Sequence, residues 1–282
     1  MTASSTDKFK LTFYHYLAFG LFMALYLQVL IGLVGEWYND DNYSHGFLIP
    51  LVTGYLLWKK RDKLKSLISS DGANWGLVII LFGMTVFVLA NAMAEYFTLR
   101  CSLIITLYGL VWYLFGRRFA LEAWFELLYL FFMVPLPYVI YYTMTFPMQL
   151  FATKVTVKIL TGIGMSAVQQ GNIIHLPGYS LEVAEACSGL RSLISLLALG
   201  AIYARMTQND LPRQLILFLS TIPIAIAANI FRVLFTAIGA YTISRELAEE
   251  FLHELSGMMV FIVAFIMMLI WGAIIKIGRK KA

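Results

Sequence analysis

Long apolar runs recur along the chain and constrain its fold more than any other feature. Hydrophobic residues make up 60% of the 282 residues and charged residues only 13%, whereas about 25% of the residues in a typical soluble domain are charged. A helix needs ~20 apolar residues to cross the hydrocarbon core of a bilayer. The strands of a membrane barrel would instead alternate polar and apolar residues, which these runs do not. The sequence therefore predicts an all-α protein, a polytopic transmembrane helical bundle.

We expect about eight spans, the first of which is not cleaved. Their approximate bounds are Leu11–Val34, Gly46–Trp58, Trp75–Ala92, Leu99–Phe115, Phe119–Leu136, Cys187–Tyr203, Leu215–Ala240 and Leu252–Ile275. The second run is short for a full crossing. The segment Tyr138–Thr161 is amphipathic, with Lys154 and Lys158 among apolar residues, so we expect it at the membrane interface or packed on the bundle. Residues 1–282 are expected to form a single integral membrane domain.

Basic residues predict the orientation of the chain. An eight-span arrangement places most of the 21 lysines and arginines on one side of the membrane, namely Lys8, Lys10, Lys59, Lys60, Arg61, Lys63, Lys65, Arg117, Arg118, Arg205, Arg213, Lys276, Arg279, Lys280 and Lys281. The positive-inside rule makes that side cytoplasmic, with both termini inside. Because this signal explains the net charge of +5, no nucleic-acid partner is expected.

A short β-hairpin is predicted outside the membrane, before the sixth span. Asn172–His175 and Tyr179–Val183 have the composition of two short strands, and Leu176–Gly178 contains the Pro-Gly turn between them. This hairpin leads directly into the segment that contains Cys187.

Cys187 is the first of three reactive side chains that the eight-span arrangement places near the outer membrane face. It lies at the start of the sixth span, where a helix N-terminus lowers the pKa of a thiol toward the reactive thiolate. Ser188 and Gly189 keep its surroundings small, so that a substrate backbone can approach. The alternative is a buried structural cysteine, which is how we interpret Cys101 among its apolar neighbours.

Arg232 is the second, in the outer part of the seventh apolar run. An arginine inside a span costs at least a few kcal/mol on insertion scales, so it normally faces a partner or a water-filled cavity. Asn229 lies three residues earlier on the same helical face. The alternative is that Arg232 reaches the outer headgroups.

His253 is the third, at the start of the eighth span, and Gly257 four residues later leaves room beside its ring. Its alternative is an ordinary interfacial polar residue. His45 is also expected on the outer side, in the sequence Ser44-His45-Gly46-Phe47. It would border the site or help to bind a substrate, or else cap a helix or lie at the interface.

A cysteine and a histidine together fit nucleophilic acyl transfer. The imidazole takes the thiol proton and later protonates the leaving amine, and Arg232 would stabilise the oxyanion of the tetrahedral intermediate. One cysteine and one histidine are too few ligands for a structural zinc site. We expect neither a metal nor another cofactor.

The chain resembles the exosortase/archaeosortase family of membrane transpeptidases. The resemblance rests on Ala186–Leu190, on Asn229 with Arg232, on His253 before Gly257, and on Ser44–Phe47 with Pro50. These segments occur in the order and spacing of the family over most of the chain. Some members carry an additional C-terminal domain, whereas this chain ends in Gly278–Ala282, so the branch without that domain is expected.

The resemblance implies a Cys187–Arg232–His253 catalytic set at the extracytoplasmic face of the inner membrane of a prokaryote. It also implies protein substrates anchored in the lipid bilayer by a C-terminal sorting tail, which consists of a Pro-Glu-Pro-type motif, a transmembrane helix and a basic cluster. A cysteine protease or transpeptidase of this kind cleaves at the motif and transfers the protein to an acceptor, whose identity stays open.

Two other functions remain open on the sequence. Arg232 and His253 would line a polar path in a small-molecule transporter or channel, and such a protein would tolerate Cys187→Ala. His45 and His253 would be axial ligands in a haem-binding electron carrier.

Overall fold

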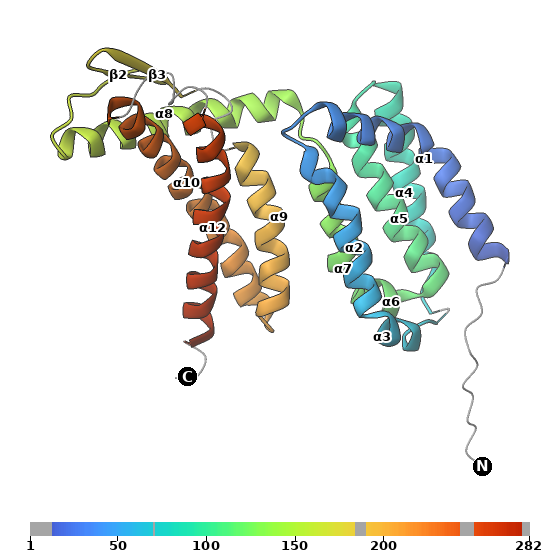
Figure 1. The fold of residues 1–282 in the computed structure, drawn as a ribbon. Helices are drawn as coiled ribbons and strands as arrows, with labels where there is room; N and C mark the ends of the chain where they lie inside the picture. Colours follow the sequence, from blue (N-terminus) through green and yellow to red (C-terminus); the bar gives the residue numbers. More distant parts are fainter. Residues whose placement is uncertain (1–12, 70, 184–189, 243–250, 278–282) are drawn as a thin grey trace. The chain divides into compact units, whose positions relative to one another are not determined.

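The computed structural model describes residues 13–69, 71–183, 190–242 and 251–277. In the helices that begin at Leu190 and Phe251, side chains are described only from Ser192 and from Gly257 onward. The chain divides into two compact units, Met1–Leu136 and Pro137–Ala282, and each is described by itself. Figure 1 shows the helices and strands of both. The prediction of a single domain stays a prediction.

The first unit is built on three long helices. They are α1 (Phe13–Asn39), α4 (Ala73–Ala92) and α5 (Tyr96–Phe115). Helices α4 and α5 approach closely at Gly76, which has no side chain; a Cβ atom added there would collide with the backbone of Tyr113. Helix α1 is joined to α5 by the buried Tyr26 hydroxyl, which lies 3.1 Å from Ser102 Oγ and 2.9 Å from Thr106 Oγ1.

Short elements complete the first unit. They are η1 (Ser44–Phe47), α2 (Leu48–Lys59), α3 (Arg61–Ser66), α6 (Arg117–Glu122), α7 (Trp124–Tyr129) and η2 (Leu130–Met133). The predicted fifth span, Phe119–Leu136, is therefore not one helix. Its last residues explain part of the interruption, since prolines at positions 135 and 137 disfavour the helical conformation of the residues before them.

The predicted all-α polytopic membrane fold is confirmed. Among the described residues, five helices are long and apolar enough to cross a membrane: Phe13–Asn39, Ala73–Ala92, Tyr96–Phe115, Leu211–Thr242 and Gly257–Lys276. A sixth is added if Trp124–Met133 and Tyr138–Gly162 are counted as one broken span. The second predicted span corresponds to α2, which has 12 residues, or ~18 Å of helix. The predicted span Cys187–Tyr203 corresponds to a shorter apolar helix, Ser192–Thr207.

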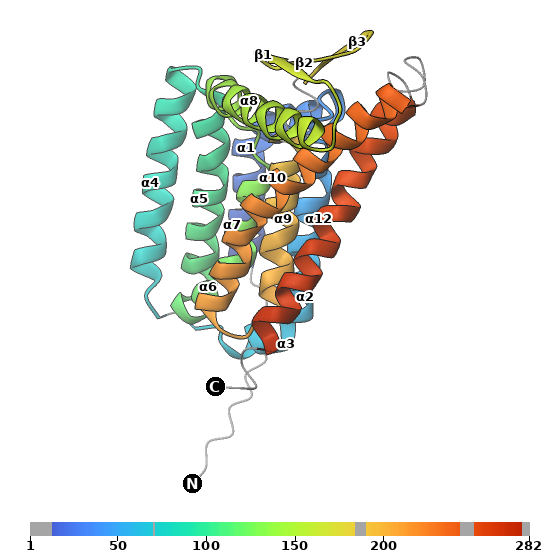
Figure 2. The ribbon, with the colours of Figure 1, turned by 90° about the vertical axis from the view of Figure 1, so that its left-hand side faces the viewer.

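The second unit packs three helices around an apolar core. They are α9 (Leu190–Thr207), α10 (Leu211–Thr242) and α12 (Phe251–Ile277), and α8 (Tyr138–Gly162) lies against α10 (Figure 2). We call their shared buried residues the bundle cluster: Tyr141, Leu193, Leu196, Ile224, Ala225, Ala228, Val260, Ala264 and Met268.

The predicted hairpin is present and has one strand more than expected. Strands β2 (Ile173–Leu176) and β3 (Tyr179–Glu182) pair antiparallel, and β1 (Val168–Gln170) pairs with the other edge of β2. The sheet is anchored to α8 and α10 by a second group of buried residues, the hairpin cluster: Ala152, Leu160, Ile174, Leu176, Val183, Val233 and Ala237.

Candidate active site

The predicted site residues are not all described. Cys187, Ser188 and Gly189 lie outside the described residues. His253 belongs to helix α12, but its side chain is not among those described. Arg232, the other predicted catalytic residue, is described in full, as are three of the predicted supporting residues.

Arg232 is buried on the inner face of α10, with 9% of its surface exposed. Its neighbours on that helix link it to both apolar groups, since Ala228 belongs to the bundle cluster and Val233 to the hairpin cluster. The arginine therefore sits at the junction of the helical bundle and the hairpin, and is not a side chain that extends into the surroundings. This placement disfavours the alternative of a simple contact with headgroups.

Helix α12 meets the Arg232 guanidinium at Gly257. A Cβ atom added at position 257 would lie 3.9 Å from Arg232 Nη2, which is an ordinary van der Waals contact. Glycine at this position therefore leaves space beside the guanidinium. Position 253 is four residues earlier and shares the same face of α12, so the helix register agrees with the predicted association of Arg232, His253 and Gly257.

The described residues that flank the Cys187 segment pack against α10 near Arg232. On one side, Val183 N–H donates to Asn172 O at 2.9 Å, and the Val183 side chain packs in the hairpin cluster with Val233. On the other side the chain enters α9, where Leu193 packs in the bundle cluster with Ala228. The expected hydrogen bond between Cys187 and His253 stays a prediction.

Asn229 brings an unsatisfied polar atom to the same face of α10. Only 2% of the residue is exposed, and its Oδ1 has no hydrogen-bond partner within the described part of the chain. A buried carbonyl oxygen without a partner costs free energy and is rare in native proteins. Asn229 is thus an available acceptor one helical turn from Arg232.

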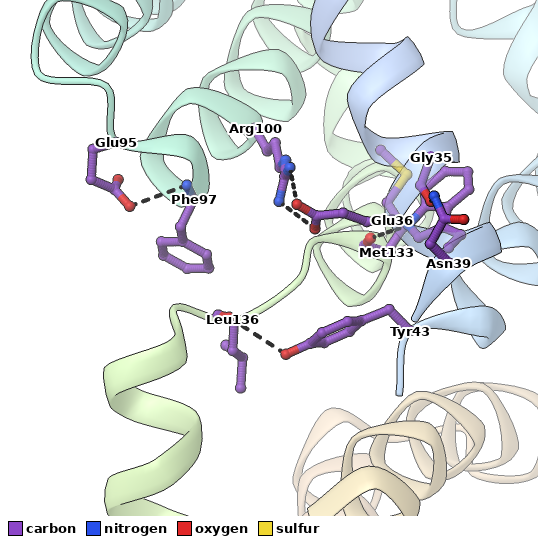
Figure 3. A network of polar contacts seen from close by, with 10 residues as sticks. Gly35, Glu36, Asn39, Tyr43, Glu95, Phe97, Arg100, Met133 and Leu136 are labelled. Carbon is purple, nitrogen blue, oxygen red and sulfur yellow. Dashed lines mark hydrogen bonds and ion pairs between the residues drawn. The ribbon is translucent and has the colours of Figure 1, made fainter. Parts of the chain in front are cut away.

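His45 and its motif belong to the first unit. The histidine and two neighbouring aromatic residues contact backbone carbonyls at the end of the predicted fifth span. His45 Nε2 lies 3.2 Å from Phe132 O, Trp37 Nε1 donates to Met133 O at 2.9 Å, and Tyr43 OH donates to Leu136 O at 3.4 Å. The last of these contacts is drawn in Figure 3. Because the helix ends here, these carbonyls need partners from outside it.

The same motif depends on a close approach at Gly46, where any side chain would collide with the Trp37 indole. Burial lowers the pKa of His45, against the opposing effect of its backbone hydrogen bonds to Phe132 and Asn42. These contacts favour the structural interpretation of Ser44–Phe47. A role for His45 in substrate binding stays a prediction.

Two buried polar features were missed by the sequence reasoning. Arg100 forms a bidentate ion pair with Glu36, at 2.7 Å (Nη1–Oε2) and 2.6 Å (Nη2–Oε1), as Figure 3 shows. The other is a row of polar residues on the buried face of α8, made up of Thr145, Gln149, Thr153 and Thr156. The row has a helical spacing of four, four and three that the sequence displays, whereas the partner of Arg100 lies 64 positions away.

Within the described residues, no group of three or more His, Cys, Asp or Glu side chains could hold a metal ion. The buried polar side chains described in the second unit are a guanidinium, carboxamides and hydroxyls, which bind and orient through hydrogen bonds.

Comparison with known proteins gives one match. The model of a family described as transmembrane exosortase matches residues 37–270, a range that includes all eight predicted site residues. No match was found among curated proteins or among solved structures.

Proposed function

The chain belongs to the transmembrane exosortase family, and we propose that it is a membrane-embedded cysteine transpeptidase. Its substrates would be exported proteins with a C-terminal sorting tail, made of a Pro-Glu-Pro-type motif, a transmembrane helix and a basic cluster. The observation that carries the proposal is the buried Arg232, which lies on α10 between the clusters that contain Val183 and Leu193, with Gly257 of α12 beside its guanidinium.

The proposed reaction has two steps. The Cys187 sulfur attacks the carbonyl carbon of the scissile peptide, the C–N bond breaks, and a thioester forms while His253 transfers a proton to the leaving amine. The acceptor then attacks the thioester carbonyl, loses a proton to His253 and releases the thiol. Arg232 donates hydrogen bonds to the oxyanion in each tetrahedral intermediate. Ser188 and Gly189 leave the approach to the sulfur open.

The proposed setting is the inner membrane of a prokaryote, with both termini in the cytoplasm and the site at the extracytoplasmic face. In the first unit, one end gathers Lys60 and Lys63 with Glu122 and Glu126, through ion pairs of 2.7 Å for Lys60–Glu126 and for Lys63–Glu122. That end carries the predicted cytoplasmic loops, and its excess of lysine and arginine supports the orientation.

The test uses the full-length protein in lipid vesicles with a reporter that carries such a tail. Cys187→Ala should abolish cleavage, and hydroxylamine should release the reporter from the wild-type enzyme by cleaving the thioester. The runner-up function, a small-molecule transporter or channel with Arg232 and His253 along a polar path, requires no thiol. Normal processing by Cys187→Ala would therefore exclude the transpeptidase.

A further inference from the structure

Helix α8 turns a polar face toward the interior of the second unit. Thr145, Gln149, Thr153 and Thr156 are buried there, and Gln149 is only 5% exposed. Their spacing places them on one side of the helix. A buried carboxamide or hydroxyl requires a hydrogen-bond partner, so this face raises the question of what it binds.

The protein satisfies only part of this polar face. Thr145 Oγ1 donates to Tyr141 O at 2.7 Å, and Thr153 Oγ1 donates to Gln149 O at 2.8 Å. Thr156 Oγ1 has no partner, and within the described part of the chain the Gln149 carboxamide makes no hydrogen bond either. Two buried polar side chains of α8 are thus left with unused hydrogen-bonding capacity.

Gln149 on α8 and Asn229 on α10 can be placed relative to the same two apolar clusters. The bundle cluster joins Tyr141 of α8 to Ala228 of α10, and the hairpin cluster joins Ala152 to Val233. Gln149 lies between the two clusters along α8.

Asn229 and Arg232 lie between the same two clusters along α10. Helices α8 and α10 are in direct contact (Figure 2), and the polar residues named on each helix lie between the same two apolar clusters. We call the carboxamides of Gln149 and Asn229 the amide pair.

We propose that the amide pair is a substrate-positioning site that binds the extended backbone of the substrate around its scissile peptide. This inference rests on the proposed function. The scissile peptide must be in a non-helical conformation when the thiol attacks, because a carbonyl within a helix is bonded to the N–H four residues later. In a membrane its freed N–H and C=O groups then need partners.

Carboxamides supply both kinds of partner, because each has two donors and an acceptor. Asn229 Oδ1, which is buried and has no partner in the part of the chain that the structure describes, would accept from a substrate N–H. Gln149 Nε2 would donate to a substrate C=O. Backbone recognition of this kind fixes the position of the scissile bond and tolerates different side chains around it.

The first experiment measures kinetics on the tailed reporter, with the full-length enzyme in vesicles. Gln149→Leu should lower kcat/KM at least tenfold, mainly through KM, and Gln149→Glu, which keeps the volume and loses the donors, should do the same. The matched control is Gln208→Leu. Gln208 is also buried, but its Nε2 donates to Gly272 O at 3.4 Å, so that variant should lose thermal stability and keep its KM.

The second experiment measures contact without turnover. A diazirine side chain is placed at position 149 or at position 143 in the Cys187→Ala background, and illuminated with the reporter. Thr143 lies on the exposed face of α8, so crosslinks should form at position 149 and not at 143. Equal crosslinking at both positions, or a normal KM in both Gln149 variants, would overturn the amide pair.

The two proposals fail in different ways. Selective crosslinking at position 149 without processing by the wild-type enzyme would reject the transpeptidase and leave the backbone site standing. Processing that requires Cys187 but has a normal KM in both Gln149 variants would reject the backbone site alone. A reporter that is neither crosslinked nor processed would reject both.

Discussion

Two buried arginines, one in each unit, have very different surroundings. Arg100 is 7% exposed, and both of its terminal nitrogens contact Glu36, which keeps 42% of its side chain exposed (Figure 3). Arg232 is 9% exposed. It lies against Gly257 and is one helical turn from Asn229, whose Oδ1 has no partner among the described residues.

The difference separates a structural arginine from a candidate functional one. A bidentate carboxylate matches the planar guanidinium and is a strong hydrogen-bonded pair, so Arg100 and Glu36 join α5 to α1. Around Arg232, a glycine provides space and an amide provides an unused acceptor. Burial is nearly the same at the two positions, so it does not distinguish their roles; the neighbouring residues do.

The largest expected effect comes from replacing each arginine with lysine. Lysine keeps the charge and loses the planar set of donors. Loss of an oriented oxyanion donor typically costs ~2.7–4 kcal/mol, or ~100- to 1,000-fold in rate, so Arg232→Lys should insert and fold yet process the reporter at a small fraction of the normal rate.

Arg100→Lys is the matched control and should retain most of the activity with a lower melting temperature. Similar rates for Arg100→Lys and Arg232→Lys would remove the functional distinction between the two sites.

The second effect concerns stability in the first unit. Glu36→Gln leaves the Arg100 charge without its carboxylate, and a hydrogen bond to a charged group contributes about 1.5–3 kcal/mol. We expect a loss in the lower part of this range, because Glu36 is partly exposed. Thermal unfolding in detergent measures it. Asp62→Asn, at an exposed surface pair, is the control and should change the melting temperature little.

The third effect uses the space beside Arg232. Gly257→Ala should raise the free energy of unfolding by about 0.4–1 kcal/mol, because alanine favours the helix and its Cβ makes only ordinary contact with the guanidinium. If substrate or His253 uses that space, processing should slow severalfold. Gly20→Ala, at a position with nothing within 4 Å of the added Cβ, should give a similar stabilisation and normal processing.

The smallest effect is a pH dependence in the first unit. Because burial lowers the pKa of His45, the unfolded chain takes up a proton near pH 6.5, before the folded chain does. The contribution of His45 to stability is therefore present above about pH 6.5 and is lost as the pH falls below it.

Melting temperatures between pH 7.5 and 5 should consequently fall less in His45→Gln than in the wild type. His175→Gln, in the exposed hairpin, is the control. An unchanged slope in His45→Gln would mean that burial does not favour the neutral form of the His45 ring.

Several elements followed directly from local sequence. The helices α4 and α5 agree closely with the predicted Trp75–Ala92 and Leu99–Phe115, because a run of apolar residues specifies a membrane helix by its length alone. The hairpin was predicted from its Pro-Gly turn. The fifth run was wrong as a continuous helix, and Pro135 and Pro137, to which hydropathy gives no weight as helix breakers, account only for its end.

The site residues were only partly predictable. Arg232 attracts attention in any hydropathy profile, because a charge inside an apolar run is costly. Gln149 does not, since a single carboxamide in an amphipathic helix is ordinary. Its significance arises from the packing of α8 against α10 and from its place between the two apolar clusters that also flank Asn229 and Arg232.

The sequence by itself determined the membrane class, the helical architecture and the kinds of reactive side chain, because apolar length and charge placement are local properties of the chain. The family resemblance gave those side chains their expected roles. Tertiary structure decided which polar groups are satisfied. Arg100 and Glu36 form an ion pair across 64 positions, whereas Asn229 Oδ1 has no partner within the described ranges. Such pairing depends on how helices distant in sequence pack together, and no local pattern specifies it.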